Sequence, residues 1–267
     1  MKAVVLARGK GTRMQRADAS APIGAAQSEM ANAGLKAMIP FRRPFLDYIL
    51  SALADAACRD VCLVIGPDHD VVREHYAAQP PARVRLTFAV QAEPRGTADA
   101  VLSSEPFAAG DPFLVMNGDN YYPADVIRQL TALDGPGLPV FRKSTLVRLG
   151  NIDAGRVAAY AALDIAPDGT LRDIVEKPDP ATLARFGEDF YVSMNCWRFD
   201  RSIFEACRRT PPSARGEVEL PQAVRFAIRS IGQRFRTVPV EAGVLDLSHR
   251  ADIAEVERRL AHIDPQP

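Results

Sequence analysis

Residues 1–14 read MKAVVLARGKGTRM, an apolar run followed at once by a turn rich in glycine and basic residues. The run at residues 3–7 is short, partly β-branched and ends at Gly9, which predicts a buried strand of a parallel sheet. A glycine-rich turn that leaves such a strand exposes backbone N–H groups to phosphate, and Arg13 adds a charged donor beside it. An ordinary strand-to-helix turn has a similar composition, so this stretch alone leaves both interpretations open.

Two familiar phosphate-binding loops do not fit this turn. A dinucleotide fingerprint requires a third glycine or an alanine at position 14, which is Met14 here. A P-loop requires Gly-Lys-Ser/Thr after four spacer residues, and the turn lacks that spacing. An NAD-dependent oxidoreductase is therefore disfavoured, and the meaning of the turn must come from the rest of the chain.

The composition indicates a large globular protein with no overall charge. Its 267 residues are 47% hydrophobic, enough for a sizeable core in one large domain or two small ones. Lys plus Arg and Asp plus Glu number 33 each, so no basic field favours nucleic acid. We expect a cytoplasmic protein without a membrane partner, because no leader-like segment or long apolar run is present. The cysteines lack paired metal-binding spacing and are expected to be reduced core thiols: Cys58, Cys62, Cys196 and Cys207.

Strand-like and helix-like patterns alternate through the first half of the chain. Buried strands are expected at residues 3–7, 61–66, 84–90 and 113–116, and helices at 46–57, 70–77 and 96–103. This alternation is typical of βαβ units on a mostly parallel sheet, whose ligands gather at the carboxyl ends of the strands.

The second half has a less regular pattern. Strands at 156–165 and 170–176 flank the turn Pro167-Asp168-Gly169, which predicts an antiparallel pair. Further strands are expected at 191–199 and 235–240, and helices at 202–208, 218–231 and 253–261. The whole pattern predicts one continuous mixed α/β domain with an antiparallel addition in its second half.

Acidic and basic residues follow two of these strands. Asp119 comes after an apolar run and Gly118, where a carboxylate can bind a divalent cation, although a plain Asn-Gly-Asp turn looks the same. Glu176 and Lys177 are adjacent at a strand end, before Pro178. Side chains of adjacent strand residues point to opposite faces, so a simple surface ion pair explains this pair poorly.

Two further segments carry polar residues, one between a strand and a helix and one within an apolar run. Gln91 ends a strand and Gly96-Thr97 begins a helix, where backbone amides can meet a base or a phosphate, or only cap the helix. Asp246 lies in the apolar run VLDL, where an unpaired acid is costly. None of these signals is specific when taken alone.

Their conjunction and order are specific. The motifs GKGTRM (9–14), QAEPRGTADA (91–100), NGDN (117–120), EKP (176–178) and LDLSHRADI (245–253), with Lys36 before Met38-Ile39-Pro40, resemble the sugar-phosphate nucleotidylyltransferases. The closest group is the glucose-1-phosphate thymidylyltransferase and uridylyltransferase type. The similarity covers residues 1–253 and is strongest at 1–14 and 90–120.

The resemblance implies both an activity and an architecture. Members of that family join a nucleoside triphosphate to a sugar 1-phosphate and release pyrophosphate, and this chain would favour dTTP or UTP with glucose 1-phosphate. The implied fold is a single Rossmann-like nucleotidyltransferase domain over residues 1–267, with a mixed, mostly parallel central sheet and an antiparallel addition at the sugar site. Its nucleotide-binding half would span about 1–135, its sugar-binding half about 136–250, and a C-terminal helix 251–263.

The resemblance also assigns roles to individual residues. Arg13 would bind the departing pyrophosphate, Lys36 would lie beside the phosphates, Lys177 would contact the sugar phosphate, and Asp119 and Asp246 would share Mg²⁺. Residues implied to bind the nucleotide are Leu6, Ala7, Gly9, Gly11, Thr12, Gln91, Gly96, Thr97, Asn117 and Gly118. Residues implied to bind the sugar are Glu176, Lys177, Ser193 and Tyr160. This inventory suits in-line transfer between two anions, because positive charge offsets their repulsion.

The chain departs from the family pattern at several positions. Arg8 stands where the family usually has a small alanine and adds a cation beside the phosphate loop. Residues 15–34 are a wider insertion, whose part at 25–33 is expected to form a short helix that acts either as a lid or as a structural surface insertion. Other departures are Leu35 for proline, Ala161 and Asn195 for glycine, and Ser193 for asparagine.

These departures motivate one main alternative, a catalytically weak or inactive sugar-nucleotide-binding or regulatory protein of the same fold. Such a protein would bind ligand without releasing pyrophosphate. The retention of Arg13, Lys36, Asp119, Lys177 and Asp246 together favours the enzyme. Few residues follow the Asp246 segment, so we expect no β-helical acyltransferase domain, and the sequence is compatible with a homo-oligomer.

Overall fold

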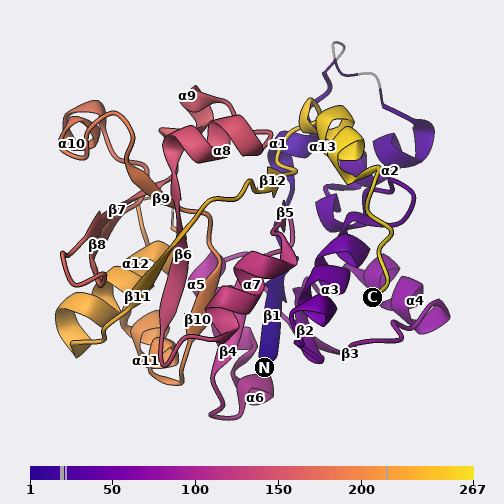
Figure 1. The fold of residues 1–267 in the computed structure, drawn as a ribbon. Helices are drawn as coiled ribbons and strands as arrows, with labels where there is room; N and C mark the ends of the chain where they lie inside the picture. The colour runs from indigo at the N-terminus through magenta and orange to yellow at the C-terminus, as the bar shows by residue number, and fades with distance from the viewer. Residues whose placement is uncertain (19–20, 22, 215) are drawn as a thin grey trace.

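Ten strands form one sheet in the part of the chain that the computed structural model describes, residues 1–18, 21, 23–214 and 216–267 (Figure 1). They are β1 (Lys2–Leu6), β2 (Asp60–Ile65), β3 (Arg85–Val90), β4 (Phe113–Asn117), β6 (Gly137–Arg142), β7 (Ala161–Ile165), β8 (Leu171–Val175), β9 (Tyr191–Ser193), β10 (Trp197–Phe199) and β11 (Arg236–Val240). Their order is β3-β2-β1-β4-β10-β6-β9-β7-β8, and β11 pairs with β6. The expected mixed sheet is confirmed.

The first half of this sheet is parallel. β1 pairs in parallel with β2 on one side and β4 on the other, so Val4 lies opposite both Cys62 and Val115. β3 extends the parallel set beyond β2. The chain steps outward from β1 to β2 and β3 and then returns to β4 on the other side of β1, so the strand order reverses at β1. In open α/β sheets, ligands bind in the crevice at such a reversal, outside the carboxyl ends of the strands.

The second half of the sheet is largely antiparallel. β10 runs antiparallel to both β4 and β6, so β6 has the same direction as β4. β9 pairs antiparallel with β6 and β7, and β7 pairs antiparallel with β8 across the predicted turn at 167–169. The predicted antiparallel addition is therefore confirmed, and β11 returns parallel to β6.

Two strand predictions in this half are wrong in extent. The strand expected at 191–199 is interrupted, because Asn195 has a φ of +58° and turns the chain between β9 and β10. Asparagine is among the few residues that adopt this left-handed conformation readily. The strand expected from 156 begins only at 161, because helix α9 (Ala154–Val157) precedes it. The Asp153 carboxylate caps this helix by accepting a hydrogen bond from the Arg156 backbone N–H at 3.0 Å, which the strand prediction overlooked.

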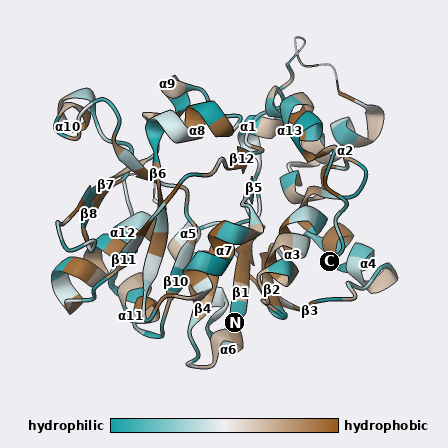
Figure 2. Ribbon diagram, in the orientation of Figure 1, coloured by the Kyte–Doolittle hydropathy of each residue, from teal (hydrophilic) through white to brown (hydrophobic). Residues whose placement is uncertain are grey.

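Helices cover both faces of the sheet, and alternate residues of β1 face the two layers. Ala3 and Val5 belong to a core cluster shared with α3 (Phe45–Asp55), α4 (Asp70–Ala78), α7 (Ala124–Thr131), α8 (Lys143–Leu149) and α13 (Asp252–Leu260). Val4 belongs to a second cluster, shared with α5 (Thr97–Ser103), α6 (Glu105–Ala108), α11 (Ser202–Arg209) and α12 (Leu220–Phe226). In Figure 2, β1 is largely brown, whereas α7 and α13 alternate teal and brown, as amphipathic helices do.

Short elements surround this core. They are α1 (Thr12–Gln15), α2 (Ala25–Ala33), α10 (Pro180–Ala184), a 3₁₀ turn at Lys36–Met38, and a small antiparallel pair formed by β5 (Asn120–Tyr121) and β12 (Leu245–Asp246). The helix expected at 25–33 is confirmed as α2, while part of the insertion around it (19, 20 and 22) lies outside the described residues. Figure 1 shows α13 beside α1 and α2 at one end of the molecule.

The remaining helix predictions hold with one correction. Helices expected near 46–57, 70–77, 96–103, 202–208 and 253–261 are present within a few residues. The helix expected at 218–231 starts at Leu220, and its last turn, Ala227–Ile231, is a π-helix. Helices α7 and α8 and strand β6 had no counterpart among the predictions.

The cysteines and the helix lengths agree with the composition. All four cysteines are buried and unpaired, and burial raises the pKa of the Cys58 thiol to about 11. Over the described ranges, no helix is both long enough and apolar enough to span a bilayer.

Candidate active site

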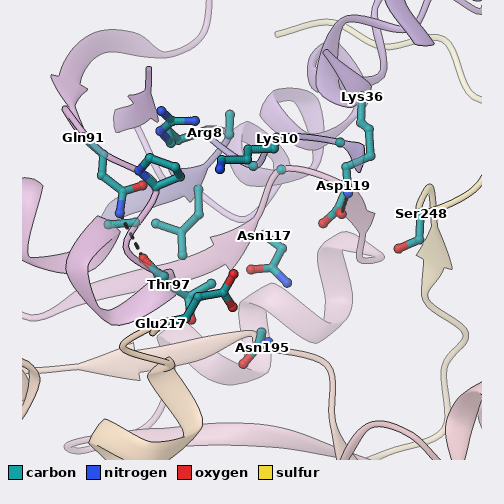
Figure 3. Close-up of a pocket in the computed structure, with 18 of the residues that line it drawn as sticks. Arg8, Lys10, Lys36, Gln91, Thr97, Asn117, Asp119, Asn195, Glu217 and Ser248 are labelled. Carbon is teal, nitrogen blue, oxygen red and sulfur yellow. Dashed lines mark hydrogen bonds and ion pairs between the residues drawn. The ribbon is translucent and has the colours of Figure 1, made fainter. Parts of the chain in front are cut away.

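A cleft of about 460 Å³ opens where the carboxyl ends of β1 and β4 meet the second half of the chain (Figure 3). Every residue predicted to bind the nucleotide lines it: Leu6, Ala7, Gly9, Gly11, Thr12, Gln91, Gly96, Thr97, Asn117 and Gly118. Arg13, Lys36, Asp119 and Glu176 line the same cleft. Residues as distant in the sequence as Leu6 and Glu176 are thus brought together at the carboxyl ends of the strands, where the strand order reverses.

The glycine-rich turn is shaped by two glycines in direct contact. Gly11 has a φ of +61°, and a Cβ there would lie 2.4 Å from the carbonyl oxygen of Gly34. Gly34, with a φ of +75°, would place a Cβ 2.4 Å from the carbonyl oxygen of Lys10. No side chain fits at either position, because both conformations favour glycine and both contacts are backbone atoms. The C-terminal end of helix α2 therefore packs directly on the turn.

Gln91 is held in one orientation by its amide nitrogen. Nε2 donates to the Gly96 carbonyl at 3.0 Å and to the Asp99 carboxylate at 2.7 Å, and the side chain is buried. Because both partners accept hydrogen bonds, the Gln91 amide must point its nitrogen, and not its oxygen, toward them. Oε1 is then left as a hydrogen-bond acceptor for a ligand in the cleft.

Lys36 and Asp119 form an ion pair across the cleft, and both side chains are mostly buried. Lys36 begins the 3₁₀ turn Lys36–Met38, and Asp119 follows β4 in the turn that leads to β5. Gly118 permits this turn to approach β1 closely, since its N–H donates to the Leu6 carbonyl at 2.9 Å. The pair places one cation and one anion at the end of the cleft opposite Gln91 (Figure 3).

Asp246 lies behind Asp119 rather than on the cleft surface. The backbone N–H of Leu247 donates to the Asp119 carbonyl at 2.9 Å, and Asp246 pairs with Asn120 in the β5–β12 ladder. Burial raises the pKa of the Asp246 carboxyl, and the negative charge of Asp119 raises it further. The two carboxylates are therefore close enough to repel each other.

One oxygen of the Asp246 carboxylate is paired within the protein. Oδ2 accepts from Arg156 Nη2 at 3.0 Å and from the Tyr160 hydroxyl at 2.5 Å. Arg156 also pairs with Asp252 at 2.5 Å, so it links β12 to helix α13. Oδ1 is buried and has no hydrogen-bond partner among the residues that the structure describes. Sequence reasoning missed Arg156, because nothing in its local pattern distinguishes it from a surface arginine.

These carboxylates fit a shared divalent cation when phosphate completes the ligand set. Among the described residues, no group of three or more His, Cys, Asp or Glu side chains could hold a metal ion by itself. Asp119 and the unpartnered Oδ1 of Asp246 supply two oxygen ligands, and Mg²⁺ commonly takes one or two carboxylates together with substrate phosphates.

The residues expected at the sugar are only partly gathered at the cleft. Glu176 lines it, whereas Lys177, Ser193 and Tyr160 do not appear among the lining residues. Lys177 has a φ of +46°, and its Nζ lies 3.8 Å from carboxylate oxygens of Glu176 and Glu219. β8 ends at Val175, so the strand alternation assumed for Glu176 and Lys177 does not apply, and the chain turns at Lys177 itself.

Two of these side chains have other contacts. The Tyr160 hydroxyl donates to Asp246, and the buried Ser193 hydroxyl accepts from the Asn195 backbone N–H at 3.1 Å. Asn195, noted in the sequence only as a departure, lines the cleft at the break between β9 and β10. In this structure Tyr160 and Ser193 therefore form hydrogen bonds with neighbouring residues and do not line the cleft.

The second half adds lining residues that sequence reasoning missed. They include Glu217, Glu219, Pro221 and Ser248. The segment carrying the two acids is anchored through Val218, whose N–H donates to the Arg95 carbonyl at 2.7 Å and whose carbonyl accepts from the Ala98 N–H at 2.9 Å. The available signal was the alternation GEVEL at 216–220, which overlaps the start of the helix expected at 218–231.

Comparison with known proteins agrees with this geometry. The Nucleotidyl transferase family model matches residues 2–239. A UTP–glucose-1-phosphate uridylyltransferase, AglF, of Haloferax volcanii is 28% identical over 97% of this chain and 96% of its own length. A glucose-1-phosphate thymidylyltransferase of Streptomyces antibioticus is also 28% identical, over 100% of this chain and 68% of its own.

A solved structure shares the fold. The crystal structure of a UDP-glucose pyrophosphorylase complexed with UDP-glucose superposes with a TM-score of 0.76, at 17% identity over 97% of this chain and 98% of that chain. The resemblance inferred from the motifs and the expected fold class are both confirmed. With a family match that spans residues 2–239, this chain belongs to the nucleotidyl transferase family of enzymes.

Proposed function

We propose that this protein transfers the nucleotidyl group of UTP or dTTP to a sugar 1-phosphate, with glucose 1-phosphate preferred, and releases pyrophosphate. The observation that carries the proposal is the single cleft in which the glycine-rich turn, Gln91 and the Lys36–Asp119 pair meet Glu176 and Asn195 from the second half. Residues up to about 135 would hold the nucleotide, and residues from about 136 to 250 would hold the sugar.

The chemistry follows from the charges in the cleft. An oxygen of the sugar phosphate attacks the α-phosphorus, the bond from that phosphorus to the α–β bridging oxygen breaks, and pyrophosphate leaves with the bonding electrons. Both reactants are anions, so their approach needs cations and fixed alignment. Lys10, Arg13 and Lys36 line the cleft and would supply that charge.

Asp119 and Asp246 would hold Mg²⁺ with the phosphate oxygens. When bound, the ion would neutralise charge that develops on those oxygens. Lys36 already offsets the charge of Asp119, and Arg156 offsets that of Asp246, so the two acids can stay close together before the ion binds. No covalent nucleophile is required.

Gln91 and Gly96 favour a pyrimidine base. Gln91 Oε1 is available to accept the N3–H of uracil or thymine, because Nε2 is already occupied. Gly96 brings the backbone at the start of α5 close to the ligand, without a side chain. The printed names of the relatives above, one a uridylyltransferase and one a thymidylyltransferase, support the same pair of nucleotides.

The test is a matrix of nucleoside triphosphates against sugar 1-phosphates with Mg²⁺, scored by pyrophosphate release. We expect release that requires both substrates, with UTP or dTTP and glucose 1-phosphate giving the highest kcat/KM. A preference for ATP or GTP would contradict the role of Gln91. Ligand binding without release in any combination would instead support a sugar-nucleotide-binding or regulatory protein.

A further inference from the structure

Arg8 is a cleft residue whose charged group has no partner among the described residues. It lies two positions after the end of β1 and lines the cleft. Its Nε is buried and unpartnered, and Arg8 makes no hydrogen bond or ion pair with any residue in the described ranges. A buried donor without a partner destabilises the fold, so an arginine in this place points to an acceptor that arrives with a ligand.

Arg8 and Gln91 follow β1 and β3, the two strands that flank β2. Ala7 N–H donates to the Val64 carbonyl at 2.8 Å, and Gln91 N–H donates to the Ile65 carbonyl at 2.9 Å. Arg8 and Gln91 therefore leave the sheet on either side of the end of β2, and the side chains of Asp68 and His69 pack on the next residue, Gly66, where a Cβ would lie 2.4 Å from Asp68 Oδ1. Figure 3 shows Arg8 and Gln91 at one end of the cleft, and Lys36 and Asp119 at the other.

The groups around Arg8 give it no internal counter-charge. Burial lowers the pKa of the nearby His69 imidazole, and the positive charges of Arg8 and Arg73 lower it further. The nearest acid in this loop, Asp68, lies 3.9 Å from His69 Nε2 and forms no ion pair with Arg8. The guanidinium thus remains available to the cleft.

The phosphates have other cations available to them. Lys10 and Arg13 lie on the glycine-rich turn, and Lys36 pairs with Asp119 at the far end of the cleft. Arg8 is at the Gln91 end instead, so a ligand that reaches both would present its base there. An arginine has only donors, which makes it a partner for carbonyl oxygens and not for amino groups.

We infer that Arg8 is a specificity-determining residue that donates hydrogen bonds to the 4-carbonyl of the base while Gln91 Oε1 accepts the adjacent N3–H. This inference rests on the proposed function and extends it from Gln91 to a second base-reading side chain. Uracil and thymine present N3–H beside a carbonyl oxygen and fit both groups. Cytosine presents an amino group beside an unprotonated N3, which would set donor against donor at Arg8 and acceptor against acceptor at Gln91.

The experiment compares Arg8→Ala and the longer apolar Arg8→Met with wild type and with Lys10→Ala, a neighbouring cation on the phosphate turn. The kcat/KM values for UTP and CTP are measured at saturating glucose 1-phosphate, and the KM for pyrophosphate in the reverse direction. We expect both Arg8 variants to lose about 10- to 100-fold with UTP, as expected for a lost charged hydrogen bond, with little change for CTP or pyrophosphate. Lys10→Ala should weaken UTP, CTP and pyrophosphate alike.

Any of three results would overturn the inference: an equal loss of kcat/KM for UTP and CTP, a raised KM for pyrophosphate, or a ratio of UTP to CTP kcat/KM that stays at the wild-type value in both Arg8 variants. Titration calorimetry measures the affinities of wild type and Arg8→Met for UTP and CTP, and so tests the inference about Arg8 separately from the proposed function. A wild-type preference for UTP that disappears in Arg8→Met supports the role of Arg8 even if no pyrophosphate is released. Release of pyrophosphate with an unchanged UTP preference in Arg8→Met refutes that role and leaves the proposed transferase standing.

Discussion

Gly96 and Val218 are in backbone contact: a Cβ on Gly96 would lie 2.4 Å from the Val218 carbonyl oxygen. Gly96 has a φ of +111°, which glycine adopts without strain. The contact ties the turn that begins α5 in the first half to the segment that carries Glu217 and Glu219 into the cleft. The close packing of the two halves at Gly96 and Val218 therefore requires glycine at position 96. This requirement is separate from the base contact proposed for Gly96.

Gly96→Ala should consequently weaken both the fold and nucleotide binding. We expect the free energy of unfolding to fall by about 2–4 kcal/mol, because backbone strain and a clash with a carbonyl add together. The KM for UTP should rise as the Val218 segment shifts. Urea denaturation measures the first effect and steady-state kinetics the second.

Gly110→Ala is the matched control for this change. Gly110 has a φ of +87° but nothing within 4 Å of the added Cβ, so only the backbone strain, about 1 kcal/mol, should appear. Equal destabilisation by the two substitutions would show that the Val218 contact is unimportant.

Asp119→Asn tests the charge at the far end of the cleft. Turnover should fall by about 10²-fold or more, because preorganised charge at phosphoryl transfer contributes several kcal/mol. The melting temperature should change little, since asparagine can still accept a hydrogen bond from Lys36 and the repulsion between Asp119 and Asp246 is removed. Initial rates of pyrophosphate release provide the measurement.

Asp111→Asn serves as its control, because Asp111 pairs with Lys2 at the opposite end of β1, away from the cleft. We expect it to keep wild-type turnover. Near-wild-type activity in Asp119→Asn would remove Asp119 from the proposed metal site.

Asp246→Asn should change stability in a pH-dependent way. The pKa of Asp246 in the folded protein is raised above its ordinary value of 3.8, so folding favours the protonated form. The resulting stabilisation is fully present below that value and is lost as pH rises through the folded pKa. Relative to wild type, Asp246→Asn should gain stability from about pH 4 toward neutral pH.

Urea denaturation of both proteins without Mg²⁺, across that pH range, tests this expectation. Turnover of Asp246→Asn should still fall, because a neutral amide is a poorer ligand for Mg²⁺ than a carboxylate. A stability difference that is constant or shrinks with rising pH would show that Arg156 and Tyr160 fully compensate the burial of Asp246.

Lys177 and Glu176 test the sugar side of the cleft. Lys177→Arg keeps the charge but replaces a compact ammonium with a planar fork, so kcat/KM for the sugar phosphate should fall by about tenfold or more. Glu176→Gln should mainly raise the KM for the sugar phosphate, as loss of a uniform-binding contact does. Kinetics with each substrate varied in turn should show nucleotide binding unchanged in both variants.

If both variants behave like wild type, the sugar phosphate binds elsewhere in the cleft. Asn195 and Glu219, which line it from neighbouring segments, would then be the first alternatives. A defect shared equally by nucleotide and sugar would instead indicate that Lys177 supports the turn after β8.

Local sequence patterns could predict the parallel half of the fold and the residues that line the proposed nucleotide side of the cleft. The strands around Val4 and Val115 are short apolar runs, which local patterns identify. The residues that follow each strand form a contiguous motif, so locating the strand end also locates the motif at the cleft. Helix α2 was also predictable, since its pattern is local.

The parts that could not be predicted depend on contacts between distant residues. The link of Asp246 to Arg156 spans 90 positions, and the approach of Val218 to Gly96 leaves no local signature beyond a glycine. The break at Asn195 was missed because the residues on both sides have high strand propensity, while a left-handed asparagine costs little. Tertiary packing, and not local preference, decides these features.

The central claim is the sugar-dependent transfer of a nucleotidyl group, and UTP labelled at the α-phosphorus tests it most directly. After incubation of the protein with Mg²⁺ and glucose 1-phosphate, we expect the label in a nucleotide sugar, with one pyrophosphate released for each transfer and no label attached to protein. Without the sugar phosphate, the label should remain in UTP. Label that stays in UTP under all conditions, or that appears as free UMP, would contradict the account.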